Sequence, residues 1–258
     1  MPEEPIGEAT PAIVVRDLRK VYGARAAVDG VNLTVPRGAF YGFLGPNGAG
    51  KSTTIRMLTG LAEPTSGTIE LLGRKMPGEA MEIKRRIGLV PDDSLLFDRL
   101  TGAEFLEFVG RMYGLERRQA RERGGELLEL FELAGERRKL IGDYSKGMRK
   151  RVAMAASLIH RPELFLMDEP FEGVDAVGAR LMKDILLSEV KHGATVFLTS
   201  HVLEVVERLC NWAAIIHEGR IVAEGRMADL RTGEQTLEEV FVKTVGGGRE
   251  YERLEWLS

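Results

Sequence analysis

The most constraining feature of the sequence is a glycine-rich segment between an apolar run and a stretch that can form a helix. Residues 45–53 read Gly-Pro-Asn-Gly-Ala-Gly-Lys-Ser-Thr, which fits the pattern G-x-x-x-x-G-K-[ST]. The apolar run 40–44 comes directly before this segment, and residues 54–61 are helix-forming. Closely spaced glycines let backbone N–H groups turn toward phosphate oxygens, and a helix start adds partial positive charge. The segment therefore predicts a loop that binds a nucleoside triphosphate.

The side chains of this loop supply chemistry that the backbone lacks. Lys51 brings a full positive charge to the outer phosphates, and the hydroxyl of Ser52 can ligate Mg²⁺. The other residues that we expect around the phosphates are Gly45, Pro46, Asn47, Gly48, Ala49, Gly50 and Thr53. A purely structural glycine-rich turn is the alternative, and the Lys-Ser pair together with both flanking elements argues against it.

A second motif indicates what happens to the bound phosphates. Residues 164–170 read Leu-Phe-Leu-Met-Asp-Glu-Pro, an apolar strand that ends in two adjacent acids. The carboxyl ends of strands in an α/β sheet are where ligands bind. We expect Asp168 to hold Mg²⁺, directly or through water, and Glu169 to polarise the attacking water as a general base. Paired acids at a strand end are also common as helix caps, and the phosphate-binding loop favours the catalytic interpretation.

Composition and charge narrow the class of protein. The chain has 258 residues, of which 44% are hydrophobic and 29% charged, and this composition is ordinary for a globular protein. Its net charge of −3 argues against a protein whose main function is to bind nucleic acid. Cys210 is the only cysteine, so no disulfide can form within the chain. No apolar stretch reaches the length of a membrane span and no secretory signal is visible. We therefore expect that any membrane role depends on a partner.

The order of strand-like and helical segments predicts an α/β fold. Strands at both ends and helices in the middle indicate a P-loop NTPase core, with a mixed sheet and an antiparallel β subdomain, and a helical insertion subdomain. We expect a flexible leader at 1–11, a single domain at 12–245 and a flexible tail at 246–258. Within the domain, the core would occupy 12–96 and 162–225, the helical subdomain 97–161 and a C-terminal helix 226–245. Thr101 and Glu104 predict a capping box at the start of a helix.

Further short segments accompany the two motifs. They are Val21-Tyr22-Gly23, Ser145-Lys146-Gly147-Met148, Phe171-Glu172-Gly173-Val174-Asp175 and His201, which follows Leu198-Thr199-Ser200. Together with the two motifs they resemble the ATP-binding cassette (ABC) family over residues 13–225, in the family's order. Residues 45–53 then correspond to the Walker A motif, residues 164–169 to the Walker B motif, and residues 145–148 to the signature, which is normally Leu-Ser-Gly-Gly-Gln.

The resemblance implies a role for each segment. Tyr22 would stack on adenine, and Ser145 and the N–H of Gly147 would bind the γ-phosphate of an ATP held by another subunit. Asp175, on the loop that crosses the dimer interface, would belong to the same ATP-binding set. His201 would contact that phosphate and orient the catalytic acid. The catalytic residues implied in this way are Glu169, His201 and Lys51.

The resemblance also implies partners and cofactors. Two cassettes would pack head to tail around ATP and Mg²⁺, with a second copy of this chain or a homologous cassette as the partner, and hydrolysis would let them part. The motifs Tyr-Ser-Lys-Gly-Met, Glu-Pro-Phe-Glu-Gly-Val-Asp and Leu-Glu-Glu-Val-Phe are similar to those of the bacterial exporter-type subclass. In that subclass the ATPase is a separate chain that binds a transmembrane permease. The expected location is cytoplasmic, peripheral on the inner face of the cell membrane.

The sequence departs from the family pattern at named positions. Asp92 stands where the family has a glutamine that senses Mg²⁺ and water, and we expect it still to contact the metal. Lys146 and Met148 replace a glycine and a glutamine of the signature, and Val174 replaces a leucine. Lys146 either complements the charge of the partner's ATP or points to solvent.

Other functions remain to be weighed against a transporter ATPase. A soluble ABC-family ATPase that acts on ribosomes or DNA is the main alternative, although the chain has one cassette and no long arm or zinc site, and we expect no nucleic acid partner. A small-molecule kinase would not need the signature, Asp175 and His201, and an inactive cassette would not retain the catalytic set. Leu95, Leu96 and Phe97 either meet a helix of the permease or pack into the core.

Overall fold

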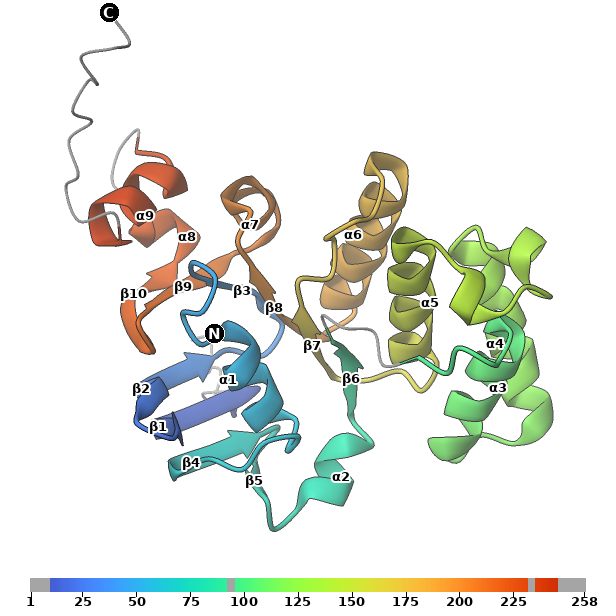
Figure 1. The fold of residues 1–258 in the computed structure, drawn as a ribbon, viewed down its shortest axis with the longest axis horizontal. Coiled ribbons are helices and arrows are strands. Elements are labelled where there is room, and N and C mark those ends of the chain that lie inside the picture. The colour runs from blue at the N-terminus through green and yellow to red at the C-terminus, as the bar shows by residue number, and fades with distance from the viewer. Residues whose placement is uncertain (1–9, 92–95, 232–234, 246–258) are drawn as a thin grey trace, which may run out of the picture.

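Two β-sheets and a group of helices make up the chain (Figure 1), for which a computed structural model describes residues 10–91, 96–231 and 235–245. The larger sheet has six strands in the order β10-β9-β3-β8-β7-β6. They are β3 (Phe40–Leu44), β6 (Ile87–Val90), β7 (Leu164–Asp168), β8 (Thr195–Ser200), β9 (Trp212–His217) and β10 (Arg220–Arg226). All neighbours are parallel except β9 and β10. The carboxyl ends of β3, β7 and β8 therefore meet at one edge of the sheet.

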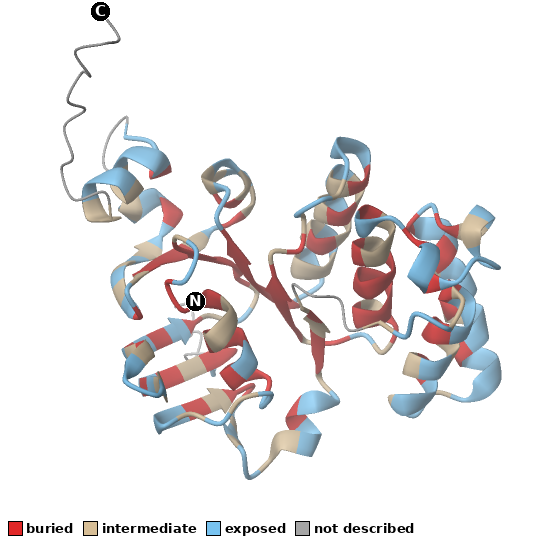
Figure 2. Cartoon of the chain, viewed as in Figure 1, coloured by how far each residue is buried: buried red, intermediate tan, exposed pale blue. Residues whose placement is uncertain are grey.

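Both faces of this sheet are covered, which explains why its strands are apolar runs rather than alternating sequences. Along β7, Leu164 and Leu166 belong to one buried cluster, and Phe165 and Met167 belong to the other. Strands β3, β7 and β8 are accordingly buried along their length at the centre of the molecule, whereas the edge strand β10 alternates between exposed and partly buried residues (Figure 2). A sheet buried on both faces holds its strand ends rigidly, and these strand ends carry the predicted acids.

The smaller sheet contains the N-terminal strands and is antiparallel. Its order is β2-β1-β4-β5, with β1 (Ile13–Tyr22), β2 (Arg25–Val35), β4 (Ser66–Leu71) and β5 (Arg74–Met76). Helix α1 (Lys51–Leu58) packs against both β2 and β7, and so lies between the two sheets (Figure 1). The loop that precedes α1 is thereby fixed between the sheets.

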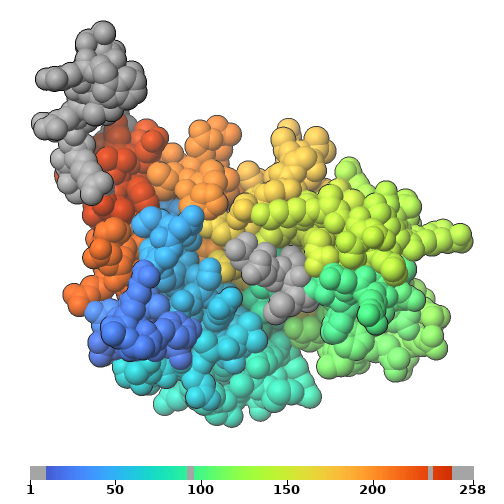
Figure 3. Space-filling model, viewed as in Figure 1, coloured from blue at the N-terminus to red at the C-terminus, as the bar shows by residue number. Residues whose placement is uncertain are grey.

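The helical part of the chain is inserted between β6 and β7, which are neighbours in the sheet. It contains α3 (Gly102–Met112), α4 (Arg117–Leu130) and α5 (Lys146–Leu158), with short 3-10 turns at Ala134–Glu136 and Ile141–Asp143. In the space-filling view this part forms one end of the molecule, and the N-terminal strands lie at the other end (Figure 3). The capping box is confirmed, since Thr101 Oγ1 accepts from the N–H of Glu104 and the Glu104 carboxylate accepts from the N–H of Thr101.

The remaining helices are α2 (Ala80–Lys84), α6 (Ala176–Lys191), α7 (Leu203–Leu209), α8 (Met227–Leu230) and α9 (Leu237–Val245). Of these, α6, α7 and α8 pack against the larger sheet, α2 lies against β5 and β6, and α9 packs against α7. The region predicted as one C-terminal helix at 226–245 contains two helices, α8 and α9, in its described part. Helix α8 ends because the backbone of Arg231 adopts an extended conformation. Among the described residues, no helix combines the length and apolar character that a membrane span needs.

Candidate functional site

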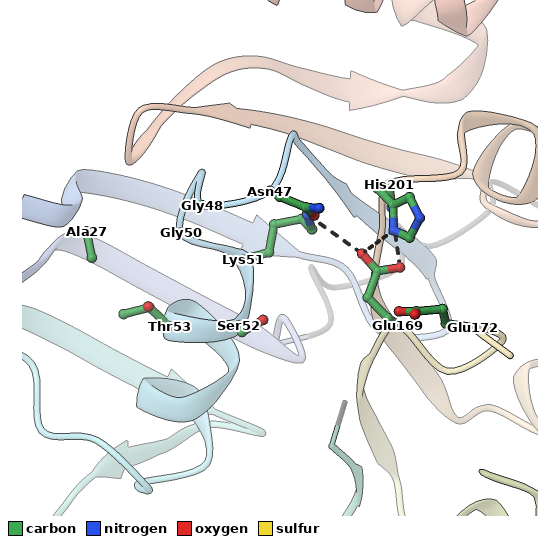
Figure 4. A pocket seen from close by; sticks show the side chains of 10 residues that line it. All are labelled: Ala27, Asn47, Gly48, Gly50, Lys51, Ser52, Thr53, Glu169, Glu172 and His201. Carbon is green, nitrogen blue, oxygen red and sulfur yellow. Dashed lines mark hydrogen bonds and ion pairs between the residues drawn. The ribbon is translucent and has the colours of Figure 1, made fainter. Parts of the chain in front are cut away.

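A cavity of about 460 Å³ opens at the edge where β3, β7 and β8 end. Figure 4 shows the side chains that line it, which come from β2, the glycine-rich loop with the start of α1, the segment after β7 and the segment after β8. They are Ala27, Asn47, Gly48, Gly50, Lys51, Ser52, Thr53, Glu169, Glu172 and His201. The structure thus brings most of the predicted phosphate-binding loop into one cavity with Glu169 and His201.

The backbone of the glycine-rich loop has a conformation that a side chain would disturb. Gly50 is the N-cap of α1 at φ 112°, and a Cβ there would lie 2.5 Å from the carbonyl oxygen of Ala27. Such a φ value favours glycine, and the short distance leaves no room for any larger residue. The helix therefore starts at Lys51, earlier than the predicted start at residue 54.

The side chain of Lys51 folds back across the glycine-rich loop and contacts its backbone. Its Nζ donates to the carbonyl oxygen of Gly45 at 2.8 Å and to that of Pro46 at 3.3 Å. The side chain is buried, so its ammonium group is held within the loop rather than extended into solvent. A triphosphate entering the cavity would meet this charge together with the N-terminus of α1.

Glu169 is the residue on which the cavity's charges converge. Its Oε1 lies 3.0 Å from Nδ1 of His201 and 3.7 Å from Nζ of Lys51 (Figure 4). The backbone N–H of His201 donates to Oε2 at 3.4 Å. Glu169 adopts φ 46°, a left-handed conformation that is uncommon for this residue type. Strained backbone of this kind gathers at functional sites, and here it follows directly on the end of β7.

Asp168 is buried and accepts a hydrogen bond from Thr199, a residue for which no role is predicted from the sequence. Thr199 Oγ1 donates to Asp168 Oδ1 at 2.5 Å, and the N–H of Glu169 donates to the same Oγ1 at 3.0 Å. The contact arises because Asp168 and Thr199 are register partners in the β7–β8 pair. The only signal in the sequence is a polar residue in an apolar strand just before His201.

The oxygen donors fit Mg²⁺, which is bound in proteins by a few oxygen ligands and keeps phosphate and water oxygens for the rest. Ser52 lines the cavity, whereas Asp168, at the end of β7 directly before the cavity residue Glu169, is not itself among the lining residues. No group of three or more His, Cys, Asp or Glu side chains suited to a metal occurs in the part of the chain that the structure describes. The predicted ligand Asp92 lies outside the described residues.

Other predicted residues are placed elsewhere. The described residues that line the cavity do not include Tyr22, Ser145, Gly147 or Asp175. Ser145 is the N-cap of α5 and accepts from the N–H of Met148, whereas Asp175 is the N-cap of α6 and accepts from the N–H of Gly178. That hydrogen bond lowers the pKa of Asp175 below its ordinary value. The structure does not bring these two residues to the phosphate-binding loop of the same chain.

Tyr22 and Lys146 each have a partner on the surface. Tyr22 is 51% exposed at the end of β1, and the Nζ of Lys20 lies 5.0 Å from the centre of its ring. Lys146 forms an ion pair of 2.7 Å with Glu172, which lines the cavity. Lys146 therefore does not point freely to solvent, and it links the first turn of α5 to the loop after β7.

Comparison with known proteins places these features in a family context. A family model described as ABC transporter matches residues 28–172. The chain is 43% identical to the daunorubicin resistance ATP-binding protein DrrA3 of Streptomyces coeruleorubidus, over 86% of the chain and 71% of that protein. It is 40% identical to the Nod factor export ATP-binding protein I of Ralstonia nicotianae, over 90% of the chain and 73% of that protein.

Solved structures similar to this chain belong to the same family. An ATP-binding subunit of an ABC transporter superposes with a TM-score of 0.84 at 31% identity, covering 90% of the chain and 99% of that protein. A dimeric ATP-binding cassette in a post-hydrolysis state with ADP and phosphate gives a TM-score of 0.78 at 25% identity, covering 86% and 100%.

Proposed function

The chain belongs to the ABC transporter family as an ATP-hydrolysing subunit, and from this premise we propose that it drives export through a separate membrane permease. The observation that carries the ATPase chemistry is the meeting of Lys51, Glu169 and His201 over one phosphate-binding loop. The relatives named for drug resistance and Nod factor export support the outward direction. The subunit would work on the cytoplasmic, inner face of the membrane, where ATP is available.

The loop and α1 would bind the triphosphate. Backbone N–H groups of the loop residues that line the cavity, together with the N-terminus of α1, would bind the phosphate oxygens. Lys51 would then exchange its carbonyl contacts for the outer phosphates. Tyr22, exposed at the end of β1, would stack on adenine at the edge of this site.

Glu169 would act as the general base for hydrolysis. Its carboxylate takes the proton of a water whose oxygen attacks the γ-phosphorus, while the bond to the bridging oxygen breaks and ADP leaves. His201, 3.0 Å from this carboxylate, would orient it and contact the γ-phosphate. Ser52, Asp168 and Asp92 would hold Mg²⁺, which when bound neutralises charge on the phosphates.

The placement of Ser145, Gly147 and Asp175 supports a shared site. These residues do not line the cavity of their own chain, yet Ser145 and Gly147 sit at the N-terminal end of α5, a position suited to an anion. In a head-to-tail dimer they would contact an ATP bound by the partner, either a second copy or a homologous cassette. The dimeric cassette among the structural neighbours supports this arrangement.

The permease would bind an apolar patch on the helical part. The patch consists of Phe97, Phe108 and Met112, which are 53%, 42% and 72% exposed. The Phe97 and Phe108 rings meet edge to face with centroids 5.2 Å apart. A cavity of about 520 Å³ borders the patch, and charged residues including Arg117 and Arg121 also line it. Exposed apolar groups rimmed by charges are typical of a protein interaction site.

The variant Glu169→Gln tests the proposal, because it removes the base and preserves the shape of the site. We expect turnover of ATP to fall by about 100-fold or more, while ATP drives the variant into a stable dimer measured by light scattering. Purified from membranes in the presence of ATP, the variant should bring a membrane permease with it. The matched control is Lys51→Ala, which should lose both ATP binding and dimer formation.

Two results would contradict the proposal. One is a Glu169→Gln protein that binds ATP but stays monomeric and brings down no membrane protein. The other is wild-type turnover that is stimulated by ribosomes or DNA and not by membranes that contain the permease.

A further inference from the structure

A buried lysine lies beneath the catalytic acids and has no role in the chemistry described above. Lys150, on the second turn of α5, is 1% exposed and is among the largest fully buried side chains of the described residues. Lysine is almost never buried to this degree unless its charge is paired or hydrogen-bonded, since an ammonium group without partners is very costly in an apolar environment. The contacts of its Nζ therefore indicate what the residue does.

Within the described residues, the Nζ of Lys150 donates to backbone carbonyls at the carboxyl edge of the larger sheet. It donates to the carbonyl oxygen of Pro91 at 3.2 Å and to that of Asp168 at 3.4 Å. Pro91 follows β6 and Asp168 ends β7, and these neighbouring strands are in register at Val90 and Met167. Lys150 thus joins α5 to the ends of two strands on either side of the point where the helical part is inserted.

The contact with Asp168 has a particular consequence, because the carbonyl of Asp168 belongs to the peptide unit that leads into Glu169. The N–H of the same peptide unit donates to Thr199 Oγ1 at 3.0 Å. One peptide plane is therefore held on both sides, by Lys150 from α5 and by Thr199 from β8. Rotation of this plane would re-aim the Glu169 side chain, whose backbone is already in the left-handed region at φ 46°.

We propose that Lys150 is a positioning residue that fixes the Asp168–Glu169 peptide and links the position of α5 to the direction of the catalytic carboxylate. The proposal deepens and rests on the proposed ATPase mechanism, in which Glu169 is the base. Ser145, five residues earlier on the same helix, is the residue expected to touch the partner's ATP. A shift of α5 on contact with that nucleotide would reach the Asp168 carbonyl through Lys150.

The test compares Lys150→Met, which keeps the length of the side chain and removes its charge, with Lys150→Arg, which keeps the charge. For Lys150→Met we expect kcat to fall about 10- to 100-fold, as for other residues that orient a catalytic group, with the Kd for ATP changed less than about threefold. For Lys150→Arg we expect recovery of at least a third of the wild-type kcat. If Lys150→Met does not fold, Lys150→Ala, which likewise cannot donate to a carbonyl, serves under the same criteria.

Arg149→Met is the matched control. Arg149 is the neighbouring cation on α5, but its contacts, to Asp98 Oδ1 at 2.6 Å and to the Ile141 carbonyl, stay within the helical part. We expect its kcat to remain within about threefold of wild type. The double variant Lys150→Met/Thr199→Val adds a second readout: its loss of kcat should be smaller than the product of the two single losses, because both residues hold one peptide.

The outcomes separate this proposal from the proposed function. A wild-type chain that does not hydrolyse ATP would overturn the proposed function itself. Wild-type turnover with full activity in Lys150→Met, or with equal losses in Lys150→Met and Arg149→Met, would overturn the positioning role alone. So would single losses that multiply without any coupling to Thr199.

Discussion

At the scale of single residues, side chains from three separate segments meet at one carboxylate. Lys51 comes from the start of α1, Glu169 from the end of β7 and His201 from the segment after β8. Lys51 and His201 together hold this carboxylate in one orientation at the edge of the cavity. A γ-phosphate would bring negative charge to the same place and would compete with Glu169 for the ammonium group of Lys51.

The contact between Thr199 and the two acids gives a prediction at this scale. Thr199→Val preserves shape but removes the hydroxyl that donates to Asp168 and accepts from the N–H of Glu169. We expect the free energy of unfolding to fall by about 1–3 kcal/mol, because a buried N–H and a buried carboxylate each lose a partner. We expect kcat to fall about 10-fold or more. Denaturant unfolding and steady-state kinetics measure the two effects, with Thr199→Ser, which retains the hydroxyl, as the control; equal behaviour of both variants would contradict the prediction.

The residues that could be predicted from the sequence are those whose motif carries their chemistry. Lys51, Glu169 and His201 were predicted to form one site, and they line one cavity. Thr199 and Lys150 could not be predicted, because a threonine suits any strand and a lysine in a basic helical stretch is usually exposed. Their contacts depend on strand register and on how α5 packs against β6, and these are tertiary features.

At the scale of elements, several helices begin with side-chain caps at positions that matter for the site. Ser145 caps α5 and Asp175 caps α6, and the same two residues are expected to contact the nucleotide of a partner. Helix α3, which carries part of the apolar patch, begins with the capping box of Thr101 and Glu104. The start of each helix is therefore fixed by a local hydrogen bond that does not depend on the partner.

The capping box gives the prediction at this scale. Thr101→Ala should lower the free energy of unfolding by about 1 kcal/mol, the usual cost of losing an N-cap side chain. Hydrogen bonds from Thr101 lower the pKa of Glu104, so the stabilisation from Glu104 is present above its ordinary pKa of about 4.3 and is lost as the pH falls through the lowered value. Urea unfolding at neutral and at acidic pH measures both effects. Equal stability of Thr101→Ala and wild type at neutral pH would contradict the prediction.

Element prediction succeeded where hydrophobic periodicity was strong and failed where it was weak. The sequence predicts a strand at 212–217 and a helix at 176–190; the strand has these bounds in the structure, and the helix, α6, ends one residue later. The sequence also predicts a helix at 126–133, whereas α4 spans Arg117–Leu130, because most residues of its first two turns are charged and show no apolar period. The short elements β5, α2 and α7 were not predicted, since a few residues do not establish a period.

At the scale of the whole molecule, the site is assembled from distant parts of the chain. Its lining residues lie between Ala27 in β2 and His201 after β8 in the sequence, so they come from segments connected to both sheets. A ligand bound there contacts elements that are joined only by tertiary packing. Binding should therefore stabilise the fold as a whole rather than one loop.

This assembly gives the prediction at this scale. At ATP concentrations about 100 times Kd, binding should add about 2.7 kcal/mol to the free energy of unfolding. For a chain of this size that corresponds to a rise in Tm of roughly 5–10 °C, measured by calorimetry of Glu169→Gln so that the ligand is not consumed. Lys51→Ala should show almost no rise. A similar rise in both variants would mean that ATP binds away from this cavity.

The insertion of the helical part between two neighbouring strands has a consequence for how such molecules diversify. Because β6 and β7 lie side by side, the chain leaves the sheet and rejoins it at adjacent positions, and the register of every other strand is independent of what lies between. Apart from α5, which contacts the end of β7 through Lys150, an excursion anchored in this way tolerates changes in the length and surface of α3 and α4 without disturbing the hydrolytic site. Selection for a new docking partner and selection for turnover can then act on different stretches of the gene.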